Sequence, residues 1–142
     1  MLDTGFATQH PDFKGRSVTT KVFTDEESIE DVQGHGTHCI GIAAGSKTPA
    51  QGPRYGVACE AEIFAGKILD DSGSGTDGSI IKGIEWAVMN KCAVISMSLG
   101  APVYGAGHSR AFETIARRAL KAGTFIVAAA GNESYRPDQI AP

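Results

Sequence analysis

The second half of the chain alternates between short, continuous apolar runs and segments with apolar residues at helical spacing. The runs at 61–69, 93–99 and 124–130 contain few polar positions, which is typical of strands buried on both faces. Between them, 77–90 and 109–122 carry apolar side chains three and four positions apart, which predicts helices. This alternation predicts an α/β fold with a doubly wound, mostly parallel sheet and helices on both faces.

The first sixty residues are less regular. Met1 and Leu2 are expected to end a strand, and residues 6–34 are polar and loop-rich, with one further strand at 18–23. A run of small, uncharged residues at about 35–44 predicts a buried helix. At the helix ends, Asp77 or Ser79 is expected to cap the helix of 77–90, and Gly123 to follow the helix of 109–122.

Composition narrows the class of protein only moderately. With 142 residues and a formal net charge of −3, the chain suits one domain and gives no reason to expect a nucleic-acid partner. No uncharged apolar run is long enough to span a membrane, and Met1-Leu2-Asp3 is no signal peptide. The three cysteines lack metal-ligand spacing, so we expect free thiols, and the cellular compartment stays open.

The groups that could do chemistry follow the predicted strands or open a helix. Because ligands bind at the carboxyl ends of parallel strands, Asp3, Asn132 and the helix-opening His35 are expected near one sheet edge. A buried acid, a base and an amide donor are the groups that a nucleophilic hydrolase needs. Each also has a structural explanation: a turn-capping aspartate, a buried histidine and a loop asparagine.

Three other interpretations compete for nearby residues. Residues 73–78 match the dinucleotide-binding pattern GxGxxG between a strand and a helix, but no acid follows the next strand to hold a ribose. His35 and His38 share a helix face without a carboxylate at zinc-site spacing. The acidic residues of 25–31 are either a solvated loop or a cation site.

At this point the chain resembles a known family, the subtilisin-like serine proteases. The resemblance covers Leu2 to about Glu133 and rests on these motifs: Asp3-Thr4-Gly5 with His10-Pro11-Asp12-Phe13, Gly34-His35-Gly36-Thr37-His38, Ser96-Met97-Ser98-Leu99-Gly100, and Ala128-Ala129-Ala130-Gly131-Asn132. Cys39 after the histidine motif, and Lys67-Ile68-Leu69-Asp70-Asp71 before Gly73, are similar to the proteinase K branch.

The resemblance implies specific roles. Asp3 would orient His35, His35 would act as general base and then general acid, and Asn132 would donate to the oxyanion. The implied substrate-binding residues are Gly73, Ser74 and Gly75 with Ser98, Leu99 and Gly100 as flanking strands, Ala128, Ala129, Ala130 and Gly131 at the pocket before the scissile bond, and Leu69 and Ile80 at further subsites. The family implies peptide or protein substrates, no cofactor for the chemistry, and structural calcium with no ligand assigned here. Secretion is favoured by the family alone.

The chain departs from the family in one essential feature. The nucleophile motif Gly-Thr-Ser-Met-Ala is absent from the 142 residues. We therefore expect residues 1–142 to be the N-terminal part of a catalytic domain, inactive alone. Uncovered sheet edges predict association with a second copy or with the missing part. The alternative is a non-catalytic homologue that binds peptides or a partner protein; a serine motif beyond Pro142 would favour the enzyme.

Two smaller expectations concern the surroundings of this site. Asp77, with Asp70 and Asp71, would favour basic substrate residues, unless Asp77 is only a helix cap. Cys39 lies one helical turn after His35, so its thiol is expected beneath the imidazole.

Overall fold

The computed structural model describes residues 1–101 and 108–132. The chain forms two compact units, Met1–Gly83 and Ile84–Pro142. Within the described part, no helix has both the length and the apolar character needed to cross a lipid bilayer.

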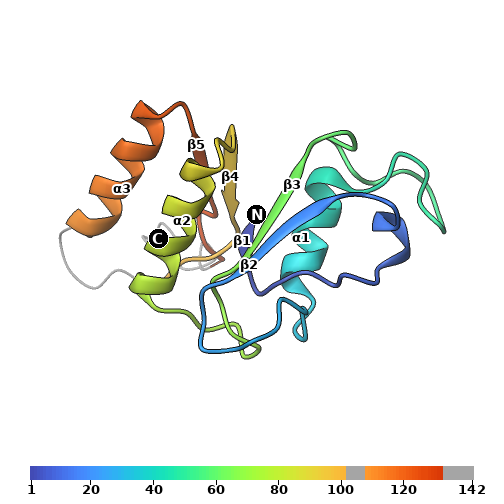
Figure 1. The fold of residues 1–142 in the computed structure, drawn as a ribbon, viewed down its shortest axis with the longest axis horizontal. Coiled ribbons are helices and arrows are strands. Elements are labelled where there is room, and N and C mark those ends of the chain that lie inside the picture. Colours follow the sequence, from blue (N-terminus) through green and yellow to red (C-terminus); the bar gives the residue numbers. More distant parts are fainter. Residues whose placement is uncertain (102–107, 133–142) are drawn as a thin grey trace. The chain divides into compact units, whose positions relative to one another are not determined.

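The first unit is built on a three-stranded parallel sheet (Figure 1). Its strands are β1 (Leu2–Asp3), β2 (Val18–Val22) and β3 (Ile63–Lys67), with β3 between the other two. In β3 only Phe64 is partly exposed, as expected for a central strand covered on both faces. The pairing of Asp3 with Lys67 brings the carboxyl ends of β1 and β3 to the same edge.

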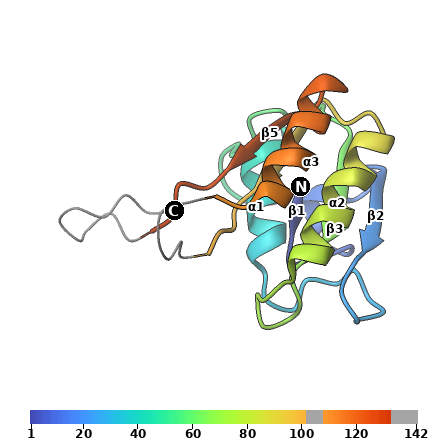
Figure 2. The ribbon, with the colours of Figure 1, turned by 90° about the vertical axis from the view of Figure 1, so that its left-hand side faces the viewer.

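Helix α1 (His35–Ala44) contacts β1 and lies alongside this sheet, as Figures 1 and 2 show. A short 3₁₀ helix, η1 (Pro11–Phe13), was not predicted; it turns the Phe13 ring edge-on to Phe6, 5.2 Å between centroids. These elements close one core, whose buried members are Phe6, Phe13, Ile40, Ala44, Ile63 and Ala65. The predicted helix of 35–44 is confirmed at both ends.

Helix α2 (Asp77–Met89) follows the loop after β3 and has a different cap from the one predicted. The Thr76 hydroxyl accepts the Ser79 N–H, and the Ser79 hydroxyl accepts the Thr76 N–H, each at 3.1 Å. This reciprocal pair makes Thr76 the cap, because a residue before the first helical turn can satisfy free N–H groups. Asp77 is the first helical residue, so the expectation of Asp77 as cap is wrong, whereas Ser79 takes part in the capping as the reciprocal partner of Thr76.

The second unit pairs β4 (Val94–Met97) with β5 (Phe125–Ala128), again in parallel, and α3 (Arg110–Lys121) contacts β5. Ser109, expected as the first residue of this helix, caps α3 instead, and Gly123, with φ 87°, follows the helix as predicted. The helical spacing of 109–122 predicts one inward face, made of Phe112, Ile115, Ala116, Ala119 and Leu120, and this prediction is wrong in part. Ile115 and Ala119 are buried, but Leu120 is 64% exposed and Ala116 is exposed.

The strands of this second unit are also less covered than expected. Val94 and Phe125 are more than half exposed, although their apolar run predicts burial on both faces. Among the described residues β5 pairs only with β4, so no described strand pairs with its other edge. Every strand pairing in the described residues is nonetheless parallel, which confirms the predicted α/β fold with a parallel sheet.

Candidate active site

The first unit places an acid and a histidine in direct contact. Asp3 ends β1 and His35 begins α1, and the distance from His35 Nδ1 to Asp3 Oδ1 is 2.6 Å. The Asp3 side chain is 1% exposed, whereas that of His35 is 42% exposed. Asp3 Oδ1 also accepts the N–H of Thr4 at 2.8 Å. The arrangement therefore has a buried carboxylate behind a solvent-accessible imidazole.

Glycine at position 36 allows this close approach. A Cβ on Gly36 would lie 2.5 Å from the carbonyl oxygen of Gly5 and 3.2 Å from the Cβ of Asp3. Any larger residue would push the first turn of α1 away from the strand that carries Asp3. Gly34, at the start of the helix, has φ 86°, in the left-handed region that glycine adopts without strain.

The Cys39 thiol lies next to the imidazole, as its position in the helix predicts. Its Sγ is 3.9 Å from Nε2 and 4.0 Å from Nδ1 of His35. Asp3, His35 and Cys39 form the one trio of potential metal ligands among the described residues. His38 does not belong to it, so a zinc site built on His35 and His38 has no third ligand in the part of the chain that the structure describes.

The loop after β3 is shaped by Asp70. Asp70 Oδ1 accepts the N–H groups of Ser72 and Ser74, each at 2.9 Å, and the Ser72 hydroxyl at 2.6 Å. The hydrogen bonds from Ser72 and Ser74 lower the pKa of the Asp70 carboxyl below its usual value. A phosphate bound by this loop would need these backbone N–H groups as donors, but Asp70 already occupies them. This loop is therefore not suited to bind a nucleotide.

The predicted substrate residues of the first unit surround this loop. Leu69 is buried directly after β3, and Gly73 adopts φ 83°. Ser74 and Gly75 are exposed, and Ile80 is half-buried in the first turn of α2. Ser74 and Gly75 are therefore accessible from solvent, although the N–H groups of Gly73 and Ser74 already bond to Asp70.

The remaining predicted residues lie in the second unit. Ser98, Leu99 and Gly100 follow β4; Ala128 ends β5, and Ala129, Ala130, Gly131 and Asn132 follow it. The Ala129 N–H donates to the carbonyl of Met97 at 3.0 Å, which continues the parallel pairing past the last residue of β5. Because β4 and β5 run the same way, both segments leave the sheet at one edge, and Asn132 is exposed there.

Sequence reasoning missed a buried ammonium beneath the first-unit site. Lys67, the last residue of β3, is fully buried, with Nζ 2.6 Å from the Thr4 carbonyl and 2.7 Å from Asp71 Oδ1. Its Nζ is also 3.2 Å from Glu26 Oε2. Burial alone would lower the pKa of Lys67, but the bonds to Asp71 and Glu26 outweigh it and raise the pKa. Glu26, in the acidic segment 25–31 that could have been a cation site, is therefore paired with the lysine at position 67.

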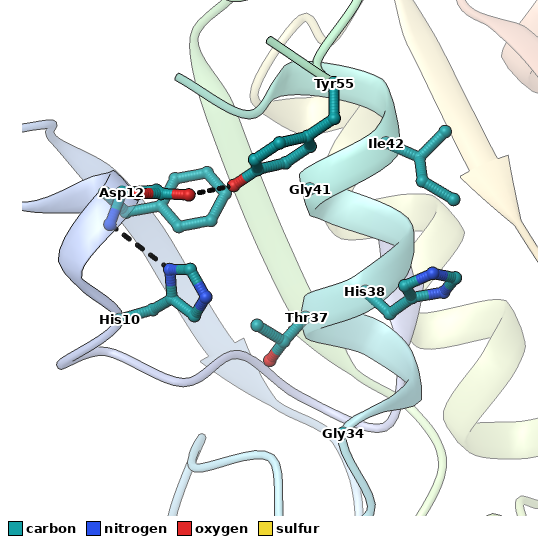
Figure 3. Close-up of a pocket in the computed structure, with 9 residues that line it drawn as sticks. His10, Asp12, Gly34, Thr37, His38, Gly41, Ile42 and Tyr55 are labelled. Carbon is teal, nitrogen blue, oxygen red and sulfur yellow. Dashed lines mark hydrogen bonds between the residues drawn. The ribbon is translucent and has the colours of Figure 1, made fainter. Parts of the chain in front are cut away.

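A separate hollow of about 490 Å³ opens on the first unit (Figure 3). Its lining residues are His10, Asp12, Phe13, Gly34, Thr37, His38, Gly41, Ile42 and Tyr55. The Tyr55 hydroxyl donates to Asp12 at 2.5 Å across one side of it. Asp3 and His35 do not line this hollow, so it is distinct from the acid–histidine pair.

The first unit thus holds a buried aspartate in contact with a solvent-accessible histidine at the carboxyl edge of a parallel sheet, where ligands of α/β folds usually bind. The sequence model of the subtilase family, peptidase S8, matches residues 1–141, and the chain belongs to this family. The predicted resemblance is therefore confirmed.

Individual relatives agree with the family match. The chain is 42% identical over 140 residues to a subtilisin-like protease of Coccidioides posadasii, covering 94% of this chain and 32% of the relative. It is 37% identical over 154 residues to subtilisin-like protease 6 of Trichophyton verrucosum, covering 100% and 34%. These fungal relatives fit the predicted proteinase K-like features. The chain spans about a third of their length.

Solved structures match as well. A cold-adapted subtilisin-like serine proteinase superposes with a TM-score of 0.75 at 34% identity, covering 92% of this chain and 45% of that one. Sphericase superposes with a TM-score of 0.76 at 35% identity, covering 95% and 46%. Nearly all of this chain thus has the subtilisin-like α/β fold, and it corresponds to just under half of each solved chain.

Proposed function

We propose that residues 1–142 form part of the catalytic domain of a subtilisin-like serine endopeptidase, with Asp3 and His35 as two members of its triad. The contact of 2.6 Å between His35 Nδ1 and Asp3 Oδ1 is the observation that carries this proposal. Family membership supplies the substrate class, peptides or proteins.

The geometry suits proton transfer at one nitrogen of His35. Because the Asp3 carboxylate accepts the Nδ1 proton, Nε2 keeps a lone pair that can take the proton of a serine hydroxyl. The resulting imidazolium is stabilised by Asp3, and His35 then returns the proton to the leaving amine. The serine itself is not among the 142 residues, since the family's nucleophile motif is absent from them. Residues 1–142 alone are therefore inactive.

Substrate would bind as an extended strand. The family resemblance assigns this role to residues 73–75 and, separately, to residues 98–100. Ala128, Ala129, Ala130 and Gly131 would line the pocket before the scissile bond, and Leu69 and Ile80 further apolar subsites. The Asn132 amide would donate to the oxyanion; losing such a donor lowers turnover by ~10²–10³.

The test has two arms with a chromogenic peptide. The whole protein, with residues 1–142 in their full context, should hydrolyse the peptide, and His35→Ala should abolish this while His10→Ala, in the separate hollow, should not. The purified 142-residue chain should show no hydrolysis that depends on His35. Peptide binding without cleavage by the whole protein would favour the non-catalytic alternative, and His35-dependent cleavage by residues 1–142 would refute the proposed missing nucleophile.

A further inference from the structure

Helix α1 begins without the side-chain cap that most helices have. The residue before it, Gly34, has no side chain, and no side-chain hydrogen bond caps the helix from that position. The first N–H groups of a helix have no acceptor within it, so another group must supply oxygens. The first turn of α1 carries His35, so the groups that fix this turn also fix the position of the imidazole.

Asp31, three residues earlier than Gly34, supplies these oxygens. Its Oδ1 accepts the Gly34 N–H at 2.9 Å, and its Oδ2 accepts the Thr37 N–H at 2.7 Å. Figure 3 shows Gly34 and Thr37 at this end of α1. A carboxylate at a helix N-terminus is also favoured by the helix dipole. Asp31 thus performs the capping that Gly34 cannot.

The same carboxylate also reaches the loop that follows Asp3. The Thr4 hydroxyl donates to Asp31 Oδ1 at 2.7 Å and accepts the Gly36 N–H at 2.9 Å. Thr4 is 1% exposed, and its own N–H donates to Asp3 Oδ1. A continuous chain of hydrogen bonds therefore links Asp31, Thr4 and the two residues on either side of His35.

We propose that Asp31 is a positioning residue, which holds the first turn of α1 against the strand end that carries Asp3 and so sets the His35–Asp3 contact. A benefit to catalysis rests on the proposed function, whereas the effect of Asp31 on the His35–Asp3 contact is independent of it. Burial tends to raise the pKa of Asp31, yet the bonds from Thr37, Thr4 and Gly34 outweigh it and lower the pKa. Asp31 therefore stays ionised at neutral pH, as a triple acceptor must.

The first test is Asp31→Asn in the 142-residue chain, observed by nuclear magnetic resonance. An amide side chain offers one oxygen and presents an N–H₂ group to one of the former donors, so at least one helix N–H loses its acceptor. Exchange of the Gly34 or Thr37 amide proton should accelerate at least about tenfold. The proton on His35 Nδ1 should shift or broaden, because its contact with Asp3 loosens.

Asp12→Asn is the matched control. Asp12 also accepts a backbone N–H, from Ala50 at 2.6 Å, and a hydroxyl, from Tyr55, but it contacts neither Asp3 nor His35. It should leave the His35 Nδ1 proton unchanged even if it lowers stability. An unchanged His35 proton in Asp31→Asn, or an equal change in both variants, would overturn the proposal.

A second pair of variants covers the case in which Asp31→Asn does not fold. Thr4→Val removes the hydroxyl that joins Asp31 to Gly36, whereas Thr4→Ser keeps it. Only Thr4→Val should move the His35 Nδ1 proton; equal behaviour of the two would refute the link. None of these readouts uses a substrate, so a failure here is distinct from a failure of the peptidase assay.

Discussion

The ammonium of Lys67 lies 2.7 Å from the carboxylate of Asp71, four residues further along the chain, and the Lys67 side chain is fully buried while that of Asp71 is 45% exposed. The pair is therefore asymmetric: one charge depends on the protein for its solvation and the other retains contact with water. This asymmetry decides which partner the fold can lose.

Replacing Lys67 by methionine should destabilise the first unit substantially. It leaves the Thr4 carbonyl without its donor and two carboxylates without their cation. Breaking a buried pair costs about 3–5 kcal/mol, and the partial exposure of Glu26 and Asp71 reduces this to roughly 2–3 kcal/mol. Asp71→Asn should cost less than about 1 kcal/mol. Urea unfolding followed by circular dichroism measures both, and equal losses would contradict the asymmetry.

Gly36→Ala should separate α1 from β1. The added methyl would meet the Gly5 carbonyl oxygen at 2.5 Å, a backbone atom that is not free to rotate away. We expect a loss of roughly 1–3 kcal/mol in unfolding free energy, with a changed His35 resonance. Gly78→Ala is the control, because its methyl would lie 3.6 Å from Thr76 Oγ1 in a helical first turn. It should be neutral or stabilise by up to about 1 kcal/mol.

The Tyr55 phenol should titrate late in alkali. Burial, together with the hydrogen bond to the Asp12 carboxylate and its charge, raises the pKa of Tyr55 to about 12. Between a pH of about 10, where the unfolded state releases this proton, and about 12, the folded state still holds it. The stability that this retained proton contributes is fully present below a pH of about 10 and is lost as the pH rises through about 12.

Ultraviolet titration of the phenolate measures this value, with Tyr55→Phe subtracted to isolate Tyr55 from the other tyrosines. Asp12→Asn should bring the midpoint part of the way back toward about 10, since burial remains. A Tyr55 midpoint near that of an ordinary tyrosine would show that the Asp12 contact does not persist in solution.

A bulky mercurial bound to Cys39 should disturb His35. The thiol is only 3.9 Å from Nε2, so a group attached to it must displace the imidazole or cover the nitrogen. The carbon-bound ring protons of His35 should shift on modification, and the proteolytic activity proposed for the whole protein should fall. Cys39→Ala should remove the response, whereas Cys59→Ala with Cys92→Ala should retain it. Unchanged His35 signals after stoichiometric labelling of Cys39 would contradict the contact.

The sequence predicted the elements well where a single local pattern determines them. The uncharged run of 35–44, the helical spacing of 109–122 and the apolar run around Ala65 each correspond to one element of the structure. The predictions that were wrong depend on neighbours instead. Leu120 has the right spacing for burial, yet no described element covers it. Thr76 was missed as a cap because three polar residues precede the helical pattern and spacing alone does not choose among them.

The site was predictable in its parts but not in its support. Asp3 and His35 stand in recognisable motifs, and the structure brings them together. Asp31 gave a weaker signal, an acid three residues before the glycine that precedes a helix, and its acceptor bonds depend on the path of the loop. Lys67 gave a clearer signal, a lysine flanked by apolar residues at the end of a strand, which implies a buried partner without saying which of several nearby acids it is.

The two-residue strand β1 has a consequence for the order of folding. It is held by pairing with β3, and the Met1 amino group donates to the carbonyl of Phe64, 63 positions away along the chain. A contact this distant must overcome the entropy of closing a long loop, whereas the turns of α1 form locally and quickly. We therefore predict that the contact between His35 and Asp3 forms late in folding, together with the pairing of β1 and β3. Its appearance in a refolding experiment would then mark the completion of the first unit.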